Sequence, residues 1–202
     1  MTPEDELGTV PAMSLAARDH PVTMTAEEFL ALPEQLPRAQ LIDGELIVVN
    51  TPAARHNRII FWLVHSYMSF ANRRAGLGEL AADASVLLDE RNVYVPDLYW
   101  VPDDRRLDDT EGLFTAPPPL VVEVRSPSTW RYDVGTKLRH YEAAGVAEAW
   151  LIDGEAGVVH LHRRSTPEAP GFDVRRELTA ADTLTTPLVP GWEIDLGDLF
   201  GS

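Results

Sequence analysis

The stretch PLVVEV, at residues 119–124, constrains the fold more than any other part of this 202-residue sequence. Its near-continuous apolar character is typical of a strand buried on both faces, as in a sheet that helices cover. Side chains alternate along a strand, so Glu123 shares a face with Val121 and Arg125 and is directed into the protein. An isolated buried carboxylate is costly, so a metal ion, Arg or Lys must lie near it.

A second acid interrupts another apolar run, VYVPDLYWV at residues 93–101. Asp97 lies in this run and raises the same problem of a buried charge. If the two strands are neighbours, Asp97 and Glu123 can share a divalent ion, because carboxylate oxygens suit Mg²⁺ or Mn²⁺. The alternative is a structural ion-pair network of these acids with Arg125 and either Arg58 or Arg131.

Lys137 is the only lysine among the 17 Lys and Arg residues of the chain. It lies on the helix predicted to follow the Glu123 strand, close enough to reach back. A compact ammonium there would orient an attacking water or neutralise charge in a transition state, which a planar guanidinium does not replace. A surface lysine is the alternative. Asp133 is predicted to cap the same helix, and Tyr141 is predicted to pack over the site.

The remaining candidates carry less specific signals. His56 is predicted to begin a long helix, either pointing at the site or lying exposed at the helix start. His160 and His162 alternate on one strand, an arrangement that usually does not bind metal. Ser126 and Ser128 suggest a nucleophile activated by lysine, but no oxyanion-hole signature accompanies them.

Local patterns predict the elements around these residues. The capping-box spacing of Thr25 and Glu28 predicts a short helix that ends near Pro33. Asp-Gly pairs at 43–44 and 153–154 predict two hairpins. An amphipathic helix is expected over about 53–74, with its inner face formed by Ile60, Leu63, Val64, Tyr67 and Ala71.

The middle of the chain is predicted to be strand-rich. Alternating residues from Leu80 to Leu88 indicate one strand, which turns at 90–92 into the strand that holds Asp97. Residues 102–118 are expected to form a charged, mobile loop, and the helix through Lys137 is expected to stop at Gly145. Helices interleaved with a mostly buried sheet predict an α/β sandwich.

Composition bounds the class of protein. The length fits one domain, 23–202, preceded by an arm at 1–22 that is either disordered or packed on a neighbour. The N-terminus is acidic and lacks a hydrophobic signal segment, so we expect a cytoplasmic protein with no membrane role. Without cysteine, any metal needs oxygen or imidazole ligands.

The net charge of -15 argues against broad nucleic-acid binding, because affinity for phosphate comes largely from clustered Lys and Arg. One segment departs from this balance. Residues 121–141 carry four basic residues against two acids. The charge obstacle to nucleic-acid binding is therefore smaller in this segment.

Taken in order, several motifs resemble those of the Uma2 family of putative restriction endonucleases, within the PD-(D/E)XK nuclease superfamily. The resemblance covers roughly residues 23–200 and rests on IDGELIVVN, His56, VPD, VVEVRSPST, Asp133, Lys137, Tyr141, GVAEAWLID and PGWEIDLGDLF. It implies a restriction-endonuclease-like core, a mixed β-sheet flanked by helices with extra β-hairpins. It also implies that Asp97 and Glu123 are catalytic metal ligands and that Lys137 is the catalytic lysine.

Two positions depart from the pattern. Arg125 stands two residues after Glu123, where the superfamily motif has lysine. Gln40 stands where similar sequences have a glutamate, and Glu45 is its nearest substitute. We therefore include Glu45 and Arg125, with His56 and Tyr141, among the residues expected to line the site.

These observations predict a Mg²⁺- or Mn²⁺-dependent DNA endonuclease. The alternative is a catalytically inactive nuclease fold that acts as a binding or assembly module, which the acidity, Gln40 and Arg125 favour. A homodimer is expected because cutting two strands is easier with two sites, and Trp130, Trp192 and the arm are candidates for its interface.

Overall fold

The computed structural model describes residues 23–32, 39–72, 74–108, 112–127 and 129–201. The predicted arm at 1–22 and Ser128 lie outside this described part. Within it, no helix is long and apolar enough to cross a membrane.

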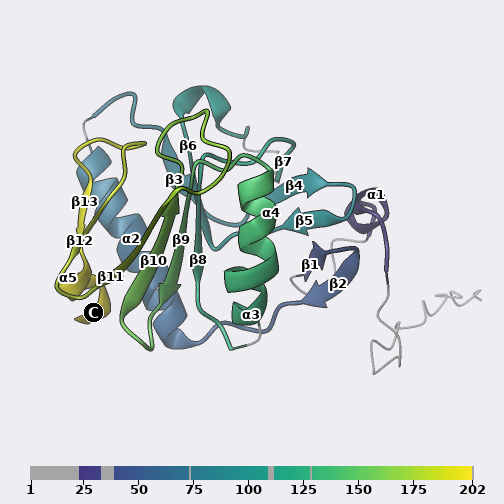
Figure 1. Ribbon diagram of the computed structural model, residues 1–202, viewed down its shortest axis with the longest axis horizontal. Helices are drawn as coiled ribbons and strands as arrows, with labels where there is room; N and C mark the ends of the chain where they lie inside the picture. Colours follow the sequence, from purple (N-terminus) through teal and green to yellow (C-terminus); the bar gives the residue numbers. More distant parts are fainter. Residues whose placement is uncertain (1–22, 33–38, 73, 109–111, 128, 202) are drawn as a thin grey trace, which may run out of the picture.

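A six-stranded mixed sheet forms the centre of the protein (Figure 1). Its strand order is β11-β10-β9-β8-β6-β3. The strands span Val174–Thr179 (β11), Val158–Arg163 (β10), Glu148–Asp153 (β9), Leu120–Val124 (β8), Leu98–Val101 (β6) and Glu79–Ala81 (β3). Only β8 and β9 run parallel, joined by a helical crossover. As predicted, every residue of β8 is buried.

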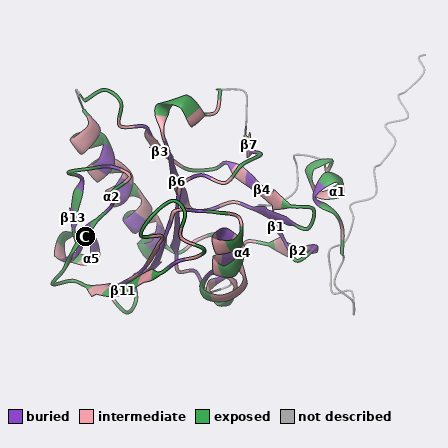
Figure 2. Cartoon of the chain, turned by 45° about the horizontal axis from the view of Figure 1, so that its top comes forward, coloured by how far each residue is buried: buried purple, intermediate pink, exposed green. Residues whose placement is uncertain are grey.

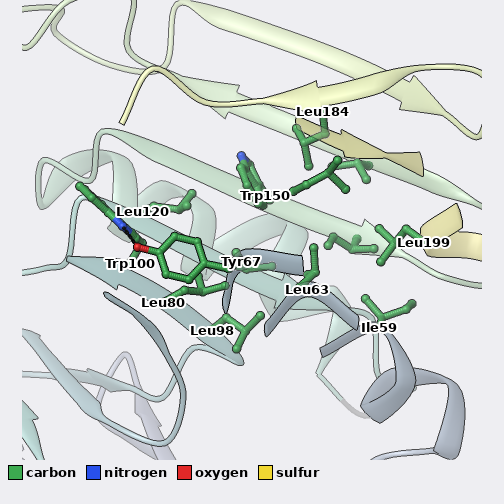
Figure 3. Packing of buried hydrophobic residues seen from close by; sticks show 14 of the residues in the cluster. Ile59, Leu63, Tyr67, Leu80, Leu98, Trp100, Leu120, Trp150, Leu184 and Leu199 are labelled. Carbon is green, nitrogen blue, oxygen red and sulfur yellow. Dashed lines mark hydrogen bonds between the residues drawn. The ribbon is translucent and has the colours of Figure 1, made fainter. Parts of the chain in front are cut away.

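Helix α2, Ala54–Ala71, covers one face of this sheet. Ile59, Leu63 and Tyr67 point from it into the core, where they meet side chains of the central strands (Figure 3). The predicted inner face was therefore partly wrong, because Ile60 and Val64 are only partly buried. The C-terminal elements complete this layer, namely β12 (Thr183–Thr185), β13 (Glu193–Asp195) and α5 (Leu196–Gly201).

The other face of the central sheet carries helix α4, Leu138–Ala143, and a second sheet of order β2-β1-β5-β4-β7. Its strands are Glu45–Val48 (β2), Ala39–Ile42 (β1), Asn92–Tyr94 (β5), Ser85–Asp89 (β4) and Leu113–Phe114 (β7). Figure 2 shows that buried residues concentrate in the central strands and where helices meet them. The layers confirm the predicted α/β class.

The single strand predicted between Leu80 and Leu88 is wrong. The chain forms β3 in the central sheet and β4 in the second sheet, and the break between them contains Asp83 with a φ of 63°. A second break, at residues 95–97, separates β5 from β6 where Pro96 lacks the N–H that a ladder needs. Between β3 and β6 the chain thus crosses twice between the sheets, and Asp97 lies at the second of these crossings.

The other local predictions fared better. The capping box of Thr25 and Glu28 begins α1, Ala26–Leu30. Both Asp-Gly turns close hairpins, β1–β2 and β9–β10. The described parts of 102–118 are more ordered than a mobile loop, since they include a 3₁₀ turn at Asp103–Arg105 and strand β7, which pairs with β4.

Candidate active site

Sheet pairing brings the two predicted acids together. Strand β6 runs antiparallel to β8 with Leu98 opposite Val122, so Asp97 lies next to the end of β8. The backbone N–H of Val124 donates to Asp97 Oδ2 over 2.7 Å. The carboxylates of Asp97 and Glu123 then border one small cavity. The predicted neighbourhood of the two strands is confirmed.

Glu123 is 3% exposed and its Oε1 atom has two donors. The Lys137 ammonium lies 2.5 Å away, and the Tyr141 hydroxyl donates to the same oxygen over 2.7 Å. Lys137 is itself 1% exposed, so it is not a surface lysine. The cation required beside Glu123 is thus the only lysine of the chain.

An irregular helix delivers these donors. It begins as α3, Trp130–Tyr132, widens into a π-helical turn at Asp133–Lys137, and continues as α4. π-helical turns are rare and are often found at functional sites. Here the turn is followed by Tyr141, which reaches the same glutamate as Lys137.

The prediction of Asp133 as a helix cap is wrong. Its carboxylate is 1% exposed and lies inside the cluster, with Oδ1 3.1 Å from Lys137 Nζ. Its other oxygen, Oδ2, accepts a hydrogen bond from the Thr129 hydroxyl over 3.0 Å. Asp133 therefore shares the ammonium with Glu123.

The cluster holds more acidic side chains than basic ones. Burial raises the pKa of Glu123 to about 8 although Lys137 opposes the shift, and the nearby carboxylates of Asp133 and Asp97 add to it. Burial disfavours the Lys137 ammonium, but Glu123 and Asp133 overcome this and raise the pKa of Lys137. Three carboxylates around one ammonium favour binding of a further cation.

His56 joins the site from the first turn of α2. Its Nε2 atom lies 3.2 Å from Asp97 Oδ2, and its side chain is buried. Burial lowers the pKa of His56, but the hydrogen bond and charge of Asp97 outweigh this and raise it overall. Of the two alternatives for His56, the exposed one is wrong: the side chain lies beside Asp97, and its role in a site stays a prediction.

The cavity between the acids is about 30 Å³, enough for an ion or a water molecule. Besides Asp97 and Glu123 it is lined by Gln40, Val49, Asn50, Pro52, His56, Ser126 and Thr129. A cleft of about 320 Å³ adjoins it and shares Gln40, Val49, His56 and Asp97.

Two residues predicted to line the site lie elsewhere. Arg125 pairs with Asp153 at 2.7 Å and with Glu155 at 3.3 Å, so the ion-pair network predicted as the alternative for Asp97 and Glu123 does not form through it. Glu45 lies opposite Ile42 at the turn of the first hairpin and lines neither cavity. Glu45 therefore does not replace the glutamate missing at position 40.

Other expectations also changed. Trp192 is 2% exposed and packs in the core, so it cannot serve a dimer interface. His160 pairs with Glu177 at 3.7 Å. Tyr94 was missed: its ring centroid lies 5.5 Å from Lys137 Nζ, but its place in an apolar run gave no signal.

The residues present fit a hard divalent ion with few protein ligands. Across the described ranges, no three His, Cys, Asp or Glu residues lie close enough to hold a metal together. Mg²⁺ is nevertheless commonly held by one or two carboxylates and several waters. Asp97 and Glu123 would supply the carboxylates, and the amide of Gln40 lines the same cavity.

Known proteins resemble this chain in sequence and in fold. Residues 26–197 match the Uma2 family, described as putative restriction endonuclease. An uncharacterized protein of Synechocystis sp., sll1609, is 25% identical over 132 residues, which is 64% of this chain and 73% of the relative. The crystal structure of a putative nuclease belonging to DUF820, from Anabaena variabilis, superposes with a TM-score of 0.74 at 22% identity and covers 88% of this chain and 98% of its own.

Proposed function

The chain belongs to the Uma2 family of putative restriction endonucleases, and on that premise we propose that it hydrolyses phosphodiester bonds of DNA with Mg²⁺ or Mn²⁺. One observation carries the proposal. Two carboxylates from neighbouring strands, those of Asp97 and Glu123, border one cavity, and a buried ammonium contacts the second of them. A nuclease needs these groups to hold a metal and to orient water.

Asp97 and Glu123 would hold the ion. When bound, it would polarise a phosphoryl oxygen and lower the pKa of a water molecule. His56 keeps the Asp97 carboxylate turned toward the cavity, because it contacts Oδ2 from α2 while Val124 N–H contacts the same atom from β8. Asp97 is therefore held from two elements.

Lys137 would orient the attacking water and offset the negative charge that develops on the phosphate. The water oxygen forms a bond to phosphorus and gives up a proton to solvent, while the bond from phosphorus to O3′ breaks in line. The released O3′ takes a proton from solvent, which leaves a 3′ hydroxyl and a 5′ phosphate. Asp133 and Tyr141 hold Lys137 and Glu123 in place and are positioning residues.

A second candidate function is a binding or assembly module that keeps the fold without the reaction. It is favoured by the 2.5 Å contact of Lys137 with Glu123, which leaves this acid already paired, and by the glutamine at position 40. Calorimetric titration with Mg²⁺ and Mn²⁺ separates the two. The module is favoured if no ion binds at millimolar concentration, or if Asp97→Ala binds the ion as the wild type does.

The test of the reaction is cleavage of supercoiled plasmid with Mg²⁺, Mn²⁺ or EDTA. We expect Asp97→Asn, Glu123→Gln and Lys137→Met each to lower the rate by a factor of about 10² or more. Arg176→Met, which removes an exposed cation on β11 outside the basic segment 121–141, should cut normally. Equal rates for the wild type and all variants would show that the cutting is not due to this site.

The same gel reports on assembly. We propose a homodimer, since two active sites cut both strands more readily than one. Linear product that appears without a nicked intermediate supports it. A monomer by sedimentation that only nicks the plasmid contradicts it.

A further inference from the structure

The cleft beside the candidate metal cavity has a chemistry that phosphate does not require. It measures about 320 Å³, within the usual size range of small-molecule sites. Its lining is mainly apolar, comprising Ala39, Val49, Ile60, Phe61, Ala82, Val95 and Pro96. The polar residues are His56 and Asp97, shared with the metal cavity, together with Gln40, Asn57 and Asp83.

Charge argues against a phosphate in this cleft. Among the described residues that line it there is no Lys or Arg, and its two acids, Asp83 and Asp97, outnumber its one imidazole, His56. The whole chain has a net charge of -15. The cleft therefore favours an uncharged group over an anionic one.

Phe61 gives the cleft an exposed flat face. It lies on α2 beyond the side that Ile59 and Leu63 turn into the core, and it is 71% exposed, the highest value among the large apolar side chains described. Covering an exposed phenyl ring with a ligand removes apolar surface from water and so stabilises the complex. Such a ring stacks readily on the face of a planar ligand.

Two amide side chains border the same space. Gln40 Oε1 accepts the Val95 N–H at 3.3 Å, which fixes the side chain with its amide NH₂ as a further donor. Asn57 lies one residue after His56 and also lines the cleft. Asn and Gln amides pair with the hydrogen-bonding edges of nucleobases.

We propose that this cleft receives one unpaired nucleobase, stacked on Phe61, while the adjacent phosphate reaches Asp97 and Glu123. The inference rests on the proposed function and adds a substrate class to it. The substrate is DNA that presents an unpaired base, in a single strand or as an extrahelical base in a duplex. An intact duplex hides its base faces and cannot make this contact.

Fluorescence anisotropy of the purified full-length protein in EDTA tests the inference without cleavage. The probes are a short labelled single strand, the same strand with abasic sites, a perfect duplex, and a duplex with one bulged base. We expect the single strand and the bulged duplex to bind more tightly than the abasic strand and the perfect duplex. Phe61→Ala should weaken the first two by about fivefold or more.

Two variants control the result. Phe61→Trp keeps a stacking face and should restore binding, while Met68→Ala removes another exposed apolar side chain of α2, 65% exposed and outside the cleft, and should change nothing. The inference fails if Phe61→Ala binds like the wild type, or if it weakens the abasic strand equally. It also fails if Phe61→Ala changes the oligomeric state in sedimentation instead, because the surface then binds a second copy.

The proposed base site and the proposed nuclease activity can be refuted independently of each other. A wild type that cuts plasmid in Mg²⁺, with Phe61→Ala unaffected, keeps the nuclease and removes the base site. A wild type that binds unpaired bases through Phe61 but cuts nothing keeps the base site and removes the nuclease.

Discussion

Replacing Lys137 by methionine should destabilise the protein in a pH-dependent way. The substitution keeps much of the side-chain volume but removes an ammonium that lies 2.5 Å from Glu123 and 3.1 Å from Asp133. Breaking a buried ion pair by removing one partner costs about 3–5 kcal/mol, because the remaining charge stays buried without a partner. We expect the lower end, about 3 kcal/mol, since Glu123 can take up a proton.

The sign of the pH dependence follows from the pKa values. The pKa of Glu123 is raised to about 8, so its carboxylate disfavours folding increasingly as pH rises from its ordinary value of 4.5 through 8. Without the ammonium this pKa rises further. Lys137→Met should therefore lose more stability at pH 9 than at pH 5.5, by up to about 1.4 kcal/mol, because pH 9 lies one unit above the wild-type pKa of Glu123 and one pKa unit corresponds to about 1.4 kcal/mol.

Urea unfolding at the two pH values, followed by circular dichroism, measures the effect. A loss of about 3 kcal/mol corresponds to a fall in Tm of about 6–12 °C for a domain of this size. Arg139→Met, an exposed cation on the same helix, should stay within about 0.5 kcal/mol of the wild type. A loss below about 1 kcal/mol at pH 9, or an equal loss at both pH values, would refute the account of the buried pair.

Three further predictions concern the same cluster. Mg²⁺ binding at pH 7 should release up to one proton, because Glu123 with a pKa of about 8 must ionise to act as a ligand. Calorimetry in buffers of different ionisation enthalpy measures the number of protons released. No release would mean that Glu123 is already ionised. Asp97→Asn should lower the pKa of His56, because the Asp97 carboxylate raises it. The variant should also lose the folding stability that this contact supplies below pH 6.5 and that the wild type loses as pH rises through the His56 pKa. An unchanged NMR titration of the His56 imidazole would contradict this. Tyr141→Phe should lower the free energy of unfolding in urea by about 1–2 kcal/mol, since it removes a hydrogen-bond donor to buried Glu123. Tyr132→Phe, whose hydroxyl contacts an exposed partner, should lower it by less than about 0.5 kcal/mol. Equal losses for the two variants would contradict this.

The centre of the site followed from the sequence because burial on both faces has a simple signature. An unbroken apolar run places Glu123 in the interior, and an interior carboxylate requires a cation. Lys137, the only lysine of the chain, follows on the next helix and is the cation that lies beside Glu123. The fold class followed from the same reasoning, because only a covered sheet buries such a strand.

The errors came from features with no periodic signal. Alternation continues across Asp83, so two strands in different sheets looked like one. Asp133 has the spacing of a cap, and only the π-helical turn moves it into the cluster. Arg125 was expected near the acids but lies just after β8, where it pairs with Asp153 and Glu155 at the turn between β9 and β10.

The π-helical turn at Asp133–Lys137 has a consequence for insertions and deletions in related chains. Loss of one residue there, for example Gly135, which has open space around it, would restore an ordinary α-helix. Each residue of an α-helix turns the side-chain direction by about 100° around the helix axis. The side chains after the deletion would therefore rotate about this axis relative to those before it. Such a chain would gain a more regular helix but could not keep Lys137 in contact with both Asp133 and Glu123. Length is therefore constrained at this turn even where residue identity is free to change.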